Sequence, residues 1–465
     1  MAEPVERKAP KSVRYSDVLP MALPSSSNRR LFLPTTGAEY APDGNNIVRI
    51  DLASDSFLNP QNTYLQYELE NSDATASSKL TPDPSPMSPF ARQRIESGGV
   101  VLEDTHQIGR LYSLLQNNQV STSNLMSEGS ILGNYNEDFV TNAPAGTDLT
   151  VRNAPRFMSA SNTVQRLGSG ESKTICVPIV SALFSQQKLI PLFLLNAGVT
   201  VELTLNNAQS VGVASTDDGA DPPVFTFVAP QWKVKNVRIV SEMVEMSNDF
   251  YDALRSEMML TGSLSIHGHG YRHYSNTIPA GTSSPTLNIP ARMKSIKSIL
   301  STFHAQANDT TTSQYSTSVF TRENITDYQY RIGSVNHPAT AVQVGNDKLA
   351  PAFAELQKCF GKFATIDVGS NCSQHTYRQN ESDDGGSGDP EREKRISTFA
   401  IGVTLDSFAN ESLESGIDSA TFSLPITLSL TRTGGDQAYA VVNDNYVMYD
   451  LFIYINADGS ASPSN

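Results

Sequence analysis

Short stretches in which apolar and polar residues alternate recur along almost the whole of this 465-residue chain. In one of them, Val48, Ile50 and Leu52 alternate with Arg49 and Asp51. Because successive side chains of a β-strand point to opposite faces of its sheet, this alternation predicts a strand with one buried face. Further strands are predicted at 63–70, 92–96, 100–104, 175–179, 199–205, 225–240, 236–246, 260–267, 285–303, 326–332, 397–404, 421–431 and 446–455.

The residues between these stretches favour the same fold class. They are mainly Ser, Thr, Asn, Gly and Pro, which are the residues of turns and loops, and the chain has 29 Gly and 26 Pro. Charged residues make up only 18% of the chain, whereas a helix-rich enzyme accumulates Glu, Lys and Arg. The composition therefore predicts an all-β protein and excludes a coiled coil, a collagen and a wholly disordered chain.

Two short helices interrupt the strand pattern. A tight hairpin is expected at 92–104, with a Gly-Gly turn, and Asp104 is expected to cap a helix that begins near Ile108. A second helical stretch is predicted at 351–363, where apolar residues recur at helical spacing. Both helices are expected to lie in connections between strands.

The length of the chain suits two or three domains, and the strand-and-loop pattern indicates two all-β units of about 190–220 residues each. The strand-and-loop pattern restarts near Trp232, so the chain divides into an N-terminal arm at 1–45, a first jelly roll at 46–231, a second jelly roll at 232–457 and a C-terminal tail at 458–465. Many short strands with long loops are typical of packed sheets of the jelly-roll type.

The arm at 1–45 is rich in Pro and Ser and has no sustained periodicity. Two interpretations stay open. The arm is either a terminus without fixed structure, or a segment that docks on neighbouring subunits or on anionic surfaces. Basic residues outnumber acidic ones near its start, which is compatible with the second interpretation.

Cysteine usage and hydropathy bear on the compartment. Cys176, Cys359 and Cys372 are an odd number at wide spacing, so they predict free thiols in a reducing compartment rather than disulfides or a zinc ribbon. No signal peptide is expected, and the longest apolar stretch, 189–199, is too short to span a bilayer. A soluble product made inside the cell is expected.

The charge balance and the motifs exclude several functions. Asp and Glu outnumber Lys and Arg by 48 to 34, a net charge of −14 that argues against wrapping duplex DNA. The sequence has no G-x-S-x-G nucleophile motif, no phosphate-binding loop, no H-E-x-x-H and no C-x-x-C. We therefore predict no enzyme activity, no catalytic residue and no cofactor.

Three histidines form the one constellation that could bind a metal. On an extended strand His267, His269 and His273 would all point to the same face. The H-x-H strand of a cupin metalloenzyme is followed by a Glu, whereas this chain continues with Gly270 and Tyr271. We interpret the histidines as a solvated polar face of a strand and predict no metal site, although their role stays open.

Five segments, taken in order, resemble the double jelly-roll major capsid proteins of tailless icosahedral DNA viruses, especially those of Polinton-like viruses and virophages. The resemblance covers most of 46–455 and depends on the joint order and spacing of the segments. The segments are DSFLNPQNTYL at 55–65, RIESGGVVLED at 94–104, KLIPLFLL at 188–195 followed by the strand 199–205, SIKSIL at 295–300 and YQYRIG at 328–333.

The resemblance implies two tandem eight-stranded antiparallel jelly rolls and a structural role in the virion. Three such chains would form a homotrimeric, pseudo-hexagonal capsomer that tiles an icosahedral shell around a DNA genome. Implied partners are further copies of the chain, a penton protein and minor capsid proteins, without sequence-specific nucleic acid. The loops at 116–170, 305–318 and 378–395 would form outer towers or seams between subunits, and the arm would tie neighbouring capsomers or reach the inner surface.

Two other functions stay open from the sequence. A β-sandwich protein that binds carbohydrate or serves in attachment needs an aromatic platform, and Trp232 is the single tryptophan. A jelly-roll metalloenzyme would be built on His267, His269 and His273. The capsid protein is the preferred hypothesis.

Overall fold

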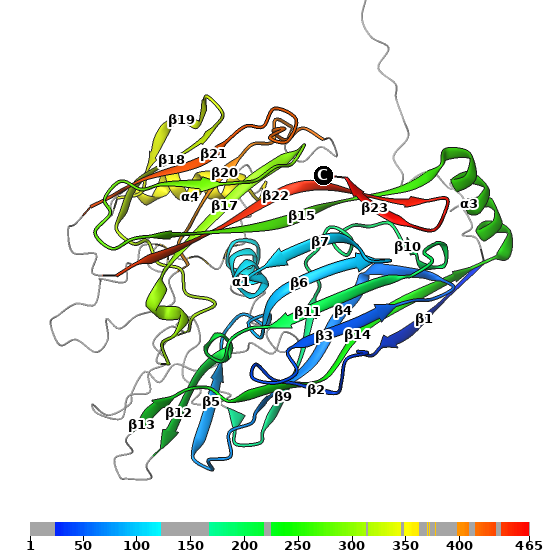
Figure 1. Cartoon of the computed structure of the whole chain (residues 1–465), viewed down its shortest axis with the longest axis horizontal. Helices are drawn as coiled ribbons and strands as arrows, with labels where there is room; N and C mark the ends of the chain where they lie inside the picture. The colour runs from blue at the N-terminus through cyan, green and yellow to red at the C-terminus, as the bar shows by residue number, and fades with distance from the viewer. Residues whose placement is uncertain are drawn as a thin grey trace, which may run out of the picture.

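The strands form five antiparallel sheets in the part of the chain that the structure describes (Figure 1). The structure is a computed structural model, and it describes residues 24–121, 167–217, 225–312, 315–345, 348–361, 370, 372, 377, 398–408, 414–433 and 439–464. Four of the sheets make two sandwiches, one in each half of the chain. The fifth sheet extends one end of the first sandwich.

The first sandwich packs two sheets around a buried apolar core. One sheet has the order β1 (Ser25–Phe32), β14 (Trp232–Met246), β4 (Phe57–Asn71) and β10 (Ile190–Pro191), with β2 (Glu39–Tyr40) on β14 and β9 (Ser172–Pro178) on β4. The facing sheet has the order β3 (Ile47–Leu52), β11 (Val199–Leu205), β6 (Phe90–Ser97) and β7 (Val100–His106). The rings of Tyr67 on β4 and Phe90 on β6 meet edge to face, with centroids 5.3 Å apart, and so join the two sheets.

The second sandwich is built in the same way. One sheet has the order β15 (Ser263–Ile278), β22 (Val441–Asn456), β17 (Ile296–Ala305) and β20 (Ala400–Thr404), with β23 (Ala461–Ser464) on β22. The facing sheet has the order β16 (Thr286–Ile289), β21 (Ile426–Arg432), β18 (Ile325–Ile332) and β19 (Val335–Gln343). The hydroxyls of Ser301 on β17 and Tyr330 on β18 lie 2.8 Å apart and link the two sheets through the core.

Both sandwiches follow one topology. If the eight main strands of each are numbered in chain order, one sheet reads 1-8-3-6 and the other reads 2-7-4-5. In the first sandwich, β9 and β10 share the sixth position, since both pair with β4. This nested pairing of early strands with late ones is the double Greek key of a jelly roll. The chain therefore contains the same jelly roll twice.

Strand pairing corrects the expected start of the first roll. The segment 1–45 was expected to be an arm, yet β1 pairs along its whole length with β14, from Ser25 opposite Met246 to Phe32 opposite Ile239. β2 also pairs with β14. Most side chains of β1 are exposed, so the strand carries no apolar alternation that a sequence pattern could reveal. Residues 1–23 lie outside the described part of the chain.

Strand pairing also corrects the expected boundary between 231 and 232. β14, which begins at Trp232, is the eighth strand of the first roll and lies between β1 and β4. The expected tail at 458–465 contains β23, which pairs with β22. In the local sequence pattern, a strand that begins after a short interruption looks the same as the start of a new domain. Pairing between distant strands leaves no local mark that would distinguish the two. We therefore propose 24–246 and 263–464 as the two rolls.

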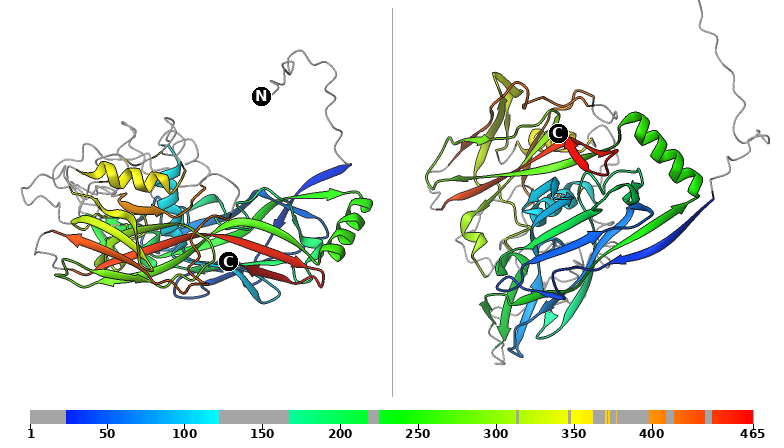
Figure 2. Two further views of the ribbon diagram at one scale, coloured as in Figure 1. Left: turned by 90° about the horizontal axis from the view of Figure 1, so that it is seen from above. Right: turned by 45° about the vertical axis from the view of Figure 1, so that its right-hand side comes forward.

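Three helices of the described segments mark the connections. α3 (Asn248–Thr261) joins the last strand of the first roll to the first strand of the second. α1 (Ile108–Gln119) follows β7, and α4 (Leu349–Lys358) follows β19, so each comes after the fifth strand of its roll. Seen from above, α1 and α4 stand on the same side of the sheets (Figure 2). The two expected helices near Ile108 and at 351–363 are thus confirmed, and they occupy equivalent positions.

The prediction that Asp104 caps the first helix is wrong. Asp104 lies inside β7, which runs on to His106, and it accepts a hydrogen bond of 2.7 Å from Arg92 Nε on β6. The residue before the helix is Gln107, whose φ of 50° turns the chain sharply and whose side chain makes no capping bond. Strand pairing with β6 holds Asp104 away from the helix start.

Loops of the first roll build the fifth sheet. Its order is β13 (Phe225–Val228), β12 (Gly212–Asp217), β5 (Ser78–Pro82) and β8 (Leu167–Gly168). Three short 3-10 helices, η2 (Leu192–Leu194), η3 (Ala208–Val211) and η4 (Gln306–Asp309), shape other loops. Within the described segments, no helix combines the length and apolar character that crossing a membrane requires.

Candidate functional site

The two rolls meet along a buried junction, where their backbones touch. β7 of the first roll lies beside β15 of the second, and Thr105 Oγ1 donates a hydrogen bond of 2.8 Å to the carbonyl of Tyr271. A Cβ on Gly268 of β15 would overlap the carbonyl oxygen of Ala182. The junction therefore accepts only a glycine at position 268 without a shift of one roll against the other.

Glu103 lies at the same place. Its side chain comes from β7, is buried, and accepts a hydrogen bond of 2.9 Å from the backbone N–H of Ala182. Burial raises the pKa of Glu103 to about 8, against the hydrogen bonds that favour the charged form. The carboxyl group is therefore largely protonated at neutral pH.

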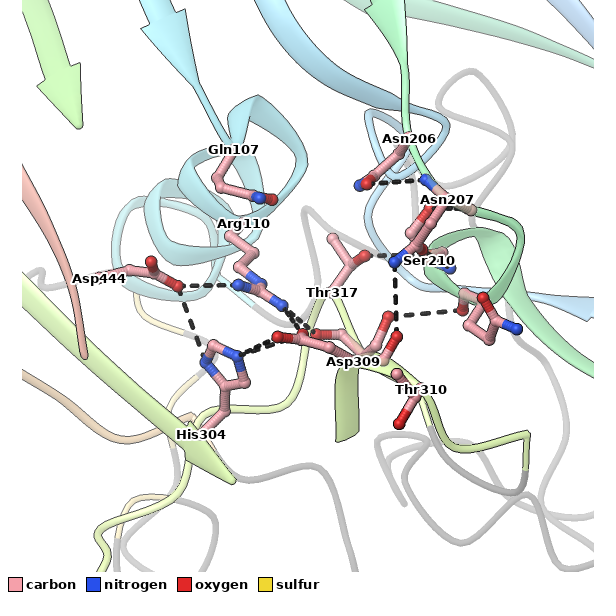
Figure 3. Close-up of polar contacts among 12 residues, drawn as sticks. Gln107, Arg110, Asn206, Asn207, Ser210, His304, Asp309, Thr310, Thr317 and Asp444 are labelled. Carbon is pink, nitrogen blue, oxygen red and sulfur yellow. Dashed lines mark hydrogen bonds and ion pairs between the residues drawn. The ribbon is translucent and has the colours of Figure 1, made fainter. Parts of the chain in front are cut away.

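Arg110 crosses the junction from α1 of the first roll (Figure 3). Its Nη1 lies 2.9 Å from Asp444 Oδ2 on β22, and its Nη2 pairs with Asp309 at the end of η4. Nη2 also donates to the carbonyl of Ser316 at 3.3 Å. One guanidinium of the first roll thus binds three groups of the second, in the forked geometry that only arginine offers.

Two histidines complete the charged group that we call the junction cluster: Arg110, Asp309, Asp444, His304 and His273. His304 lies between the carboxylates, with Nε2 3.2 Å from Asp309 Oδ1 and Nδ1 3.7 Å from Asp444 Oδ2 (Figure 3). His273 Nε2 lies 2.8 Å from Asp444 Oδ1. Burial alone would raise the pKa of Asp444, but Arg110 and the two histidines hold that pKa well below its usual range.

Smaller polar contacts extend the junction on both sides of this cluster. Thr317 Oγ1 donates to the carbonyl of Ser210 at 2.8 Å (Figure 3). Tyr446 OH donates to the carbonyl of Gln107 at 3.0 Å. Since every such bond joins one roll to the other, the junction fixes their relative orientation in directional contacts as well as in apolar packing.

A continuous apolar core accompanies these bonds. One cluster of buried side chains extends through both rolls and includes Tyr67 and Phe90 of the first and Phe303 and Tyr330 of the second. Arg110 and Asp444 are buried, whereas the side chain of Asp309 is 33% exposed. The arrangement suits a rigid connection, and the paired charges of the junction cluster are satisfied by one another.

The three histidines singled out in the sequence lie on β15, but they do not form one group. His267 and His269 both turn toward Asp450 on β22, whereas His273 turns toward Asp444 in the junction cluster. The sequence pattern missed both aspartates because they lie on a partner strand more than 170 residues away. The signal that could have found them is a pair of charged residues inside the otherwise apolar stretch 446–455 and just before it.

Two further predictions concern Trp232 and the cysteines. Trp232 is buried, with its indole Nε1 donating to the carbonyl of Ala208 at 2.9 Å, so it offers no exposed platform for a sugar. The three cysteines are free thiols, as predicted. Burial raises the pKa of the Cys359 thiol, which disfavours the reactive thiolate.

The long loops have mixed outcomes. In the segment 305–318, the described residues form η4 and then Ser316 to Ser318, which are buried at the junction within one chain. The expectation that 305–318 forms an outer tower or a seam between subunits stays a prediction. The segment 378–395 lies outside the described residues, and so does 122–166, most of the segment 116–170.

Comparison with known proteins identifies the fold. No family model and no curated protein matches the sequence. The structure is similar to that of VP54 of PBCV-1, as fitted into a reconstruction of the virophage Sputnik, with a TM-score of 0.59 and 10% identity over 97% of this chain and 99% of that one. It is also similar to the Sputnik virophage structure, with a TM-score of 0.57 and 12% identity over 100% and 93% of the two chains. The Faustovirus major capsid protein matches with a TM-score of 0.57 and 8% identity over 95% and 92%.

These likenesses extend over nearly the full length of each chain, so they include both rolls and their order. At such low identities they show the fold. The chain is a double jelly roll, which confirms the predicted fold class of two tandem eight-stranded antiparallel jelly rolls.

Proposed function

We propose that this chain is a viral major capsid protein. It forms a homotrimeric, pseudo-hexagonal capsomer, and these capsomers tile an icosahedral shell around a DNA genome. The observation that carries the proposal is the repetition of one jelly-roll topology within a single chain. The structures similar to this chain, among them the Faustovirus major capsid protein, match it over nearly their full length.

The geometry supports a trimer for a simple reason. Two similar rolls per chain give six similar units in three chains, and six similar units around an axis approximate a hexagon, which tiles a flat face. α1 and α4 occupy equivalent positions on the same side of the sheets, so the six units present the same face in the same direction (Figure 2). Closed rotational symmetry is the usual form of a homo-oligomer.

The junction between the rolls has a definite role in this function. A tile keeps its hexagonal outline only if its two rolls hold one relative orientation. The cluster of Arg110, Asp309 and Asp444, together with the close approach at Gly268, supplies that rigidity within each chain. No catalysis is needed for such a role.

Partners and location follow from the same proposal. The chain binds further copies of itself within and between capsomers, and it meets penton and minor capsid proteins at the vertices and seams of the shell. It is located in the virion after synthesis in the host cell, without secretion. The net charge of −14 favours contacts with protein over sequence-specific contacts with the genome.

The proposal is tested by the native mass of the purified full chain. Light scattering is expected to give a stable mass near three times 50.4 kDa, or closed particles that are larger still. Negative-stain images of the same sample should contain hexagonal outlines. A monomer at every protein and salt concentration tested would contradict the proposal.

A further inference from the structure

Three side chains on the outer strand pair of the second roll aim their ligand atoms at one point. His267 Nε2 lies 3.2 Å from Asp450 Oδ1, and His269 Nδ1 lies 3.1 Å from the same oxygen. All three ligand atoms lie within 4.8 Å of one another. Ligands bonded to a tetrahedral Zn²⁺ at about 2.0–2.1 Å are separated by about 3.3 Å, so the spacing of these atoms suits one shared ion.

The other carboxylate oxygen of Asp450, Oδ2, contacts two neighbouring side chains. Ser295 Oγ donates to Oδ2 at 2.5 Å, and Lys297 Nζ lies 3.5 Å from Oδ2. These contacts fix the orientation of the carboxylate and leave Oδ1 facing the two imidazoles. Such support of a ligand by neighbouring groups is typical of metal sites in proteins.

The local charge also suits a cation. Lys297 is 3.1 Å from Asp406, so its positive charge is already compensated by a second carboxylate. Two carboxylates and one ammonium leave a net negative charge beside the imidazoles.

Strand geometry places these ligands before any ion arrives. His269 stands directly opposite Asp450, and His267 directly opposite Phe452, in the register between β15 and β22. The ring of His267 packs against Phe452, with centroids 4.7 Å apart, which limits its rotation. The site is therefore preorganised on two rigid neighbouring strands (Figure 1).

We propose that His267, His269 and Asp450 bind a divalent transition-metal ion of the Zn²⁺ class, with water in the remaining position. Two imidazoles and one carboxylate favour such an ion over Mg²⁺ or Ca²⁺, which prefer oxygen ligands alone. The side chains of His267 and His269 are 33% and 47% exposed, so an ion can enter from solvent.

His273 does not belong to this site. Its Nε2 is bound to Asp444, and its side chain is only 8% exposed within the junction. The sequence favoured a solvated polar face because no Glu follows the H-x-H pattern, and the local pattern did not reveal Asp450 on the neighbouring strand. β15 is the edge strand of its sheet, so the ion would tie an edge strand to the inner strand β22 and raise the thermal stability of the second roll.

The test uses the full chain, stripped of metal with a chelator and returned to chelator-free buffer. Zn²⁺ titrated by calorimetry is expected to bind at one ion per chain, and Co²⁺ to give the visible absorption of a site with nitrogen ligands. His267→Gln and His269→Gln are each expected to weaken Zn²⁺ binding at least tenfold. His106→Gln removes another exposed histidine, on β7, and is expected to leave binding unchanged.

Two results would overturn the inference. One is the absence of a stoichiometric Zn²⁺ site in the unaltered chain. The other is an affinity for Zn²⁺ that is the same in His267→Gln and His269→Gln as in the control, His106→Gln. Folding of each variant is checked by circular dichroism, and the rise of the unaltered chain's melting temperature with Zn²⁺ provides a second readout that needs no variant. Neither readout depends on capsomer assembly.

Discussion

At the scale of single residues, the junction cluster concentrates the charge that joins the two rolls. Arg110 is buried and faces two carboxylates, Asp309 and Asp444. Removing one member of a buried ion pair leaves the others desolvated without a partner. The loss is much larger than for a pair at the surface, where water replaces the missing charge.

We expect Arg110→Ala to lower the free energy of unfolding by about 3–5 kcal/mol. The matched control is Arg92→Ala, whose pair with Asp104 joins half-buried side chains and is expected to contribute no more than about 1 kcal/mol. Urea unfolding of both variants and the unaltered chain measures the difference. Equal losses in the two variants would show that Arg110 has no special role.

The raised pKa of Glu103 predicts how the free energy of unfolding depends on pH. Its pKa is raised to about 8 in the folded chain, from an ordinary value of 4.5. Between these values the folded chain keeps a proton that the unfolded chain has lost, so the contribution of this group to stability falls as the pH rises from about 4.5 to 8. Above pH 8 both states are ionised and the contribution is constant.

Glu103→Gln removes this titration. Each unit by which folding raises a pKa corresponds to about 1.4 kcal/mol of stability that is lost as the pH rises. We therefore expect the melting temperature of this variant to fall less than that of the unaltered chain between pH 5 and pH 8. Glu257→Gln, an exposed change on α3, should follow the unaltered profile. Parallel curves for Glu103→Gln and the unaltered chain would show that the carboxyl group is ionised in the fold.

At the scale of elements, β1 decides whether the first roll is closed. It supplies the first strand of the sheet and covers one edge of β14, although its own sequence has little apolar character. Its stability therefore comes from backbone pairing with β14 along eight residues. A sheet edge stripped of its neighbour becomes a template for pairing with another chain.

Truncation tests this role of β1. A chain that begins at Pro24 keeps the strand and is expected to remain soluble, whereas a chain that begins at Leu33 lacks it and is expected to aggregate. Size-exclusion chromatography of the two purified chains gives the comparison. Identical elution of the two chains would show that β1 is dispensable, as an arm would be.

Elements also show where local patterns predict well. The alternating stretches 63–70, 199–205 and 326–332 lie in β4, β11 and β18, which have one face in the core. α3 was missed, since its segment carries only one buried side chain, Met258. Alternation predicts a strand wherever one face is buried, and it is weak for an exposed strand such as β1 or an exposed helix such as α3.

At the scale of the whole molecule, the continuous core predicts cooperative unfolding. Packed side chains extend from one roll into the other, so neither roll opens without exposing apolar surface of its neighbour. The full chain should therefore unfold in one transition by differential scanning calorimetry, although it contains two jelly rolls.

Gly268→Ala is expected to break this coupling. Its methyl group would collide with the carbonyl of Ala182 and force the rolls apart, at a cost of about 1–3 kcal/mol or more. The lower melting temperature should come with a broadened or divided transition. Gly44→Ala has open space around its Cβ and is the control. An unchanged single transition in Gly268→Ala would mean that the junction tolerates the shift.

The sequence by itself determined the fold class, the number of rolls and most buried strands. These follow from the alternation of apolar and polar residues and from composition, which are local properties of the chain. It also pointed to His267 and His269, because residues two apart on a strand share a face.

Only the tertiary structure decided which strand closes each roll, and which groups meet. β14 and β1 pair across more than 200 residues, and Asp444 and Asp450 reach the histidines of β15 across more than 170. Pairing and register depend on the whole sheet, so no local pattern specifies them. The boundary between the rolls, the junction cluster and the third ligand beside the histidines all arise from such distant contacts.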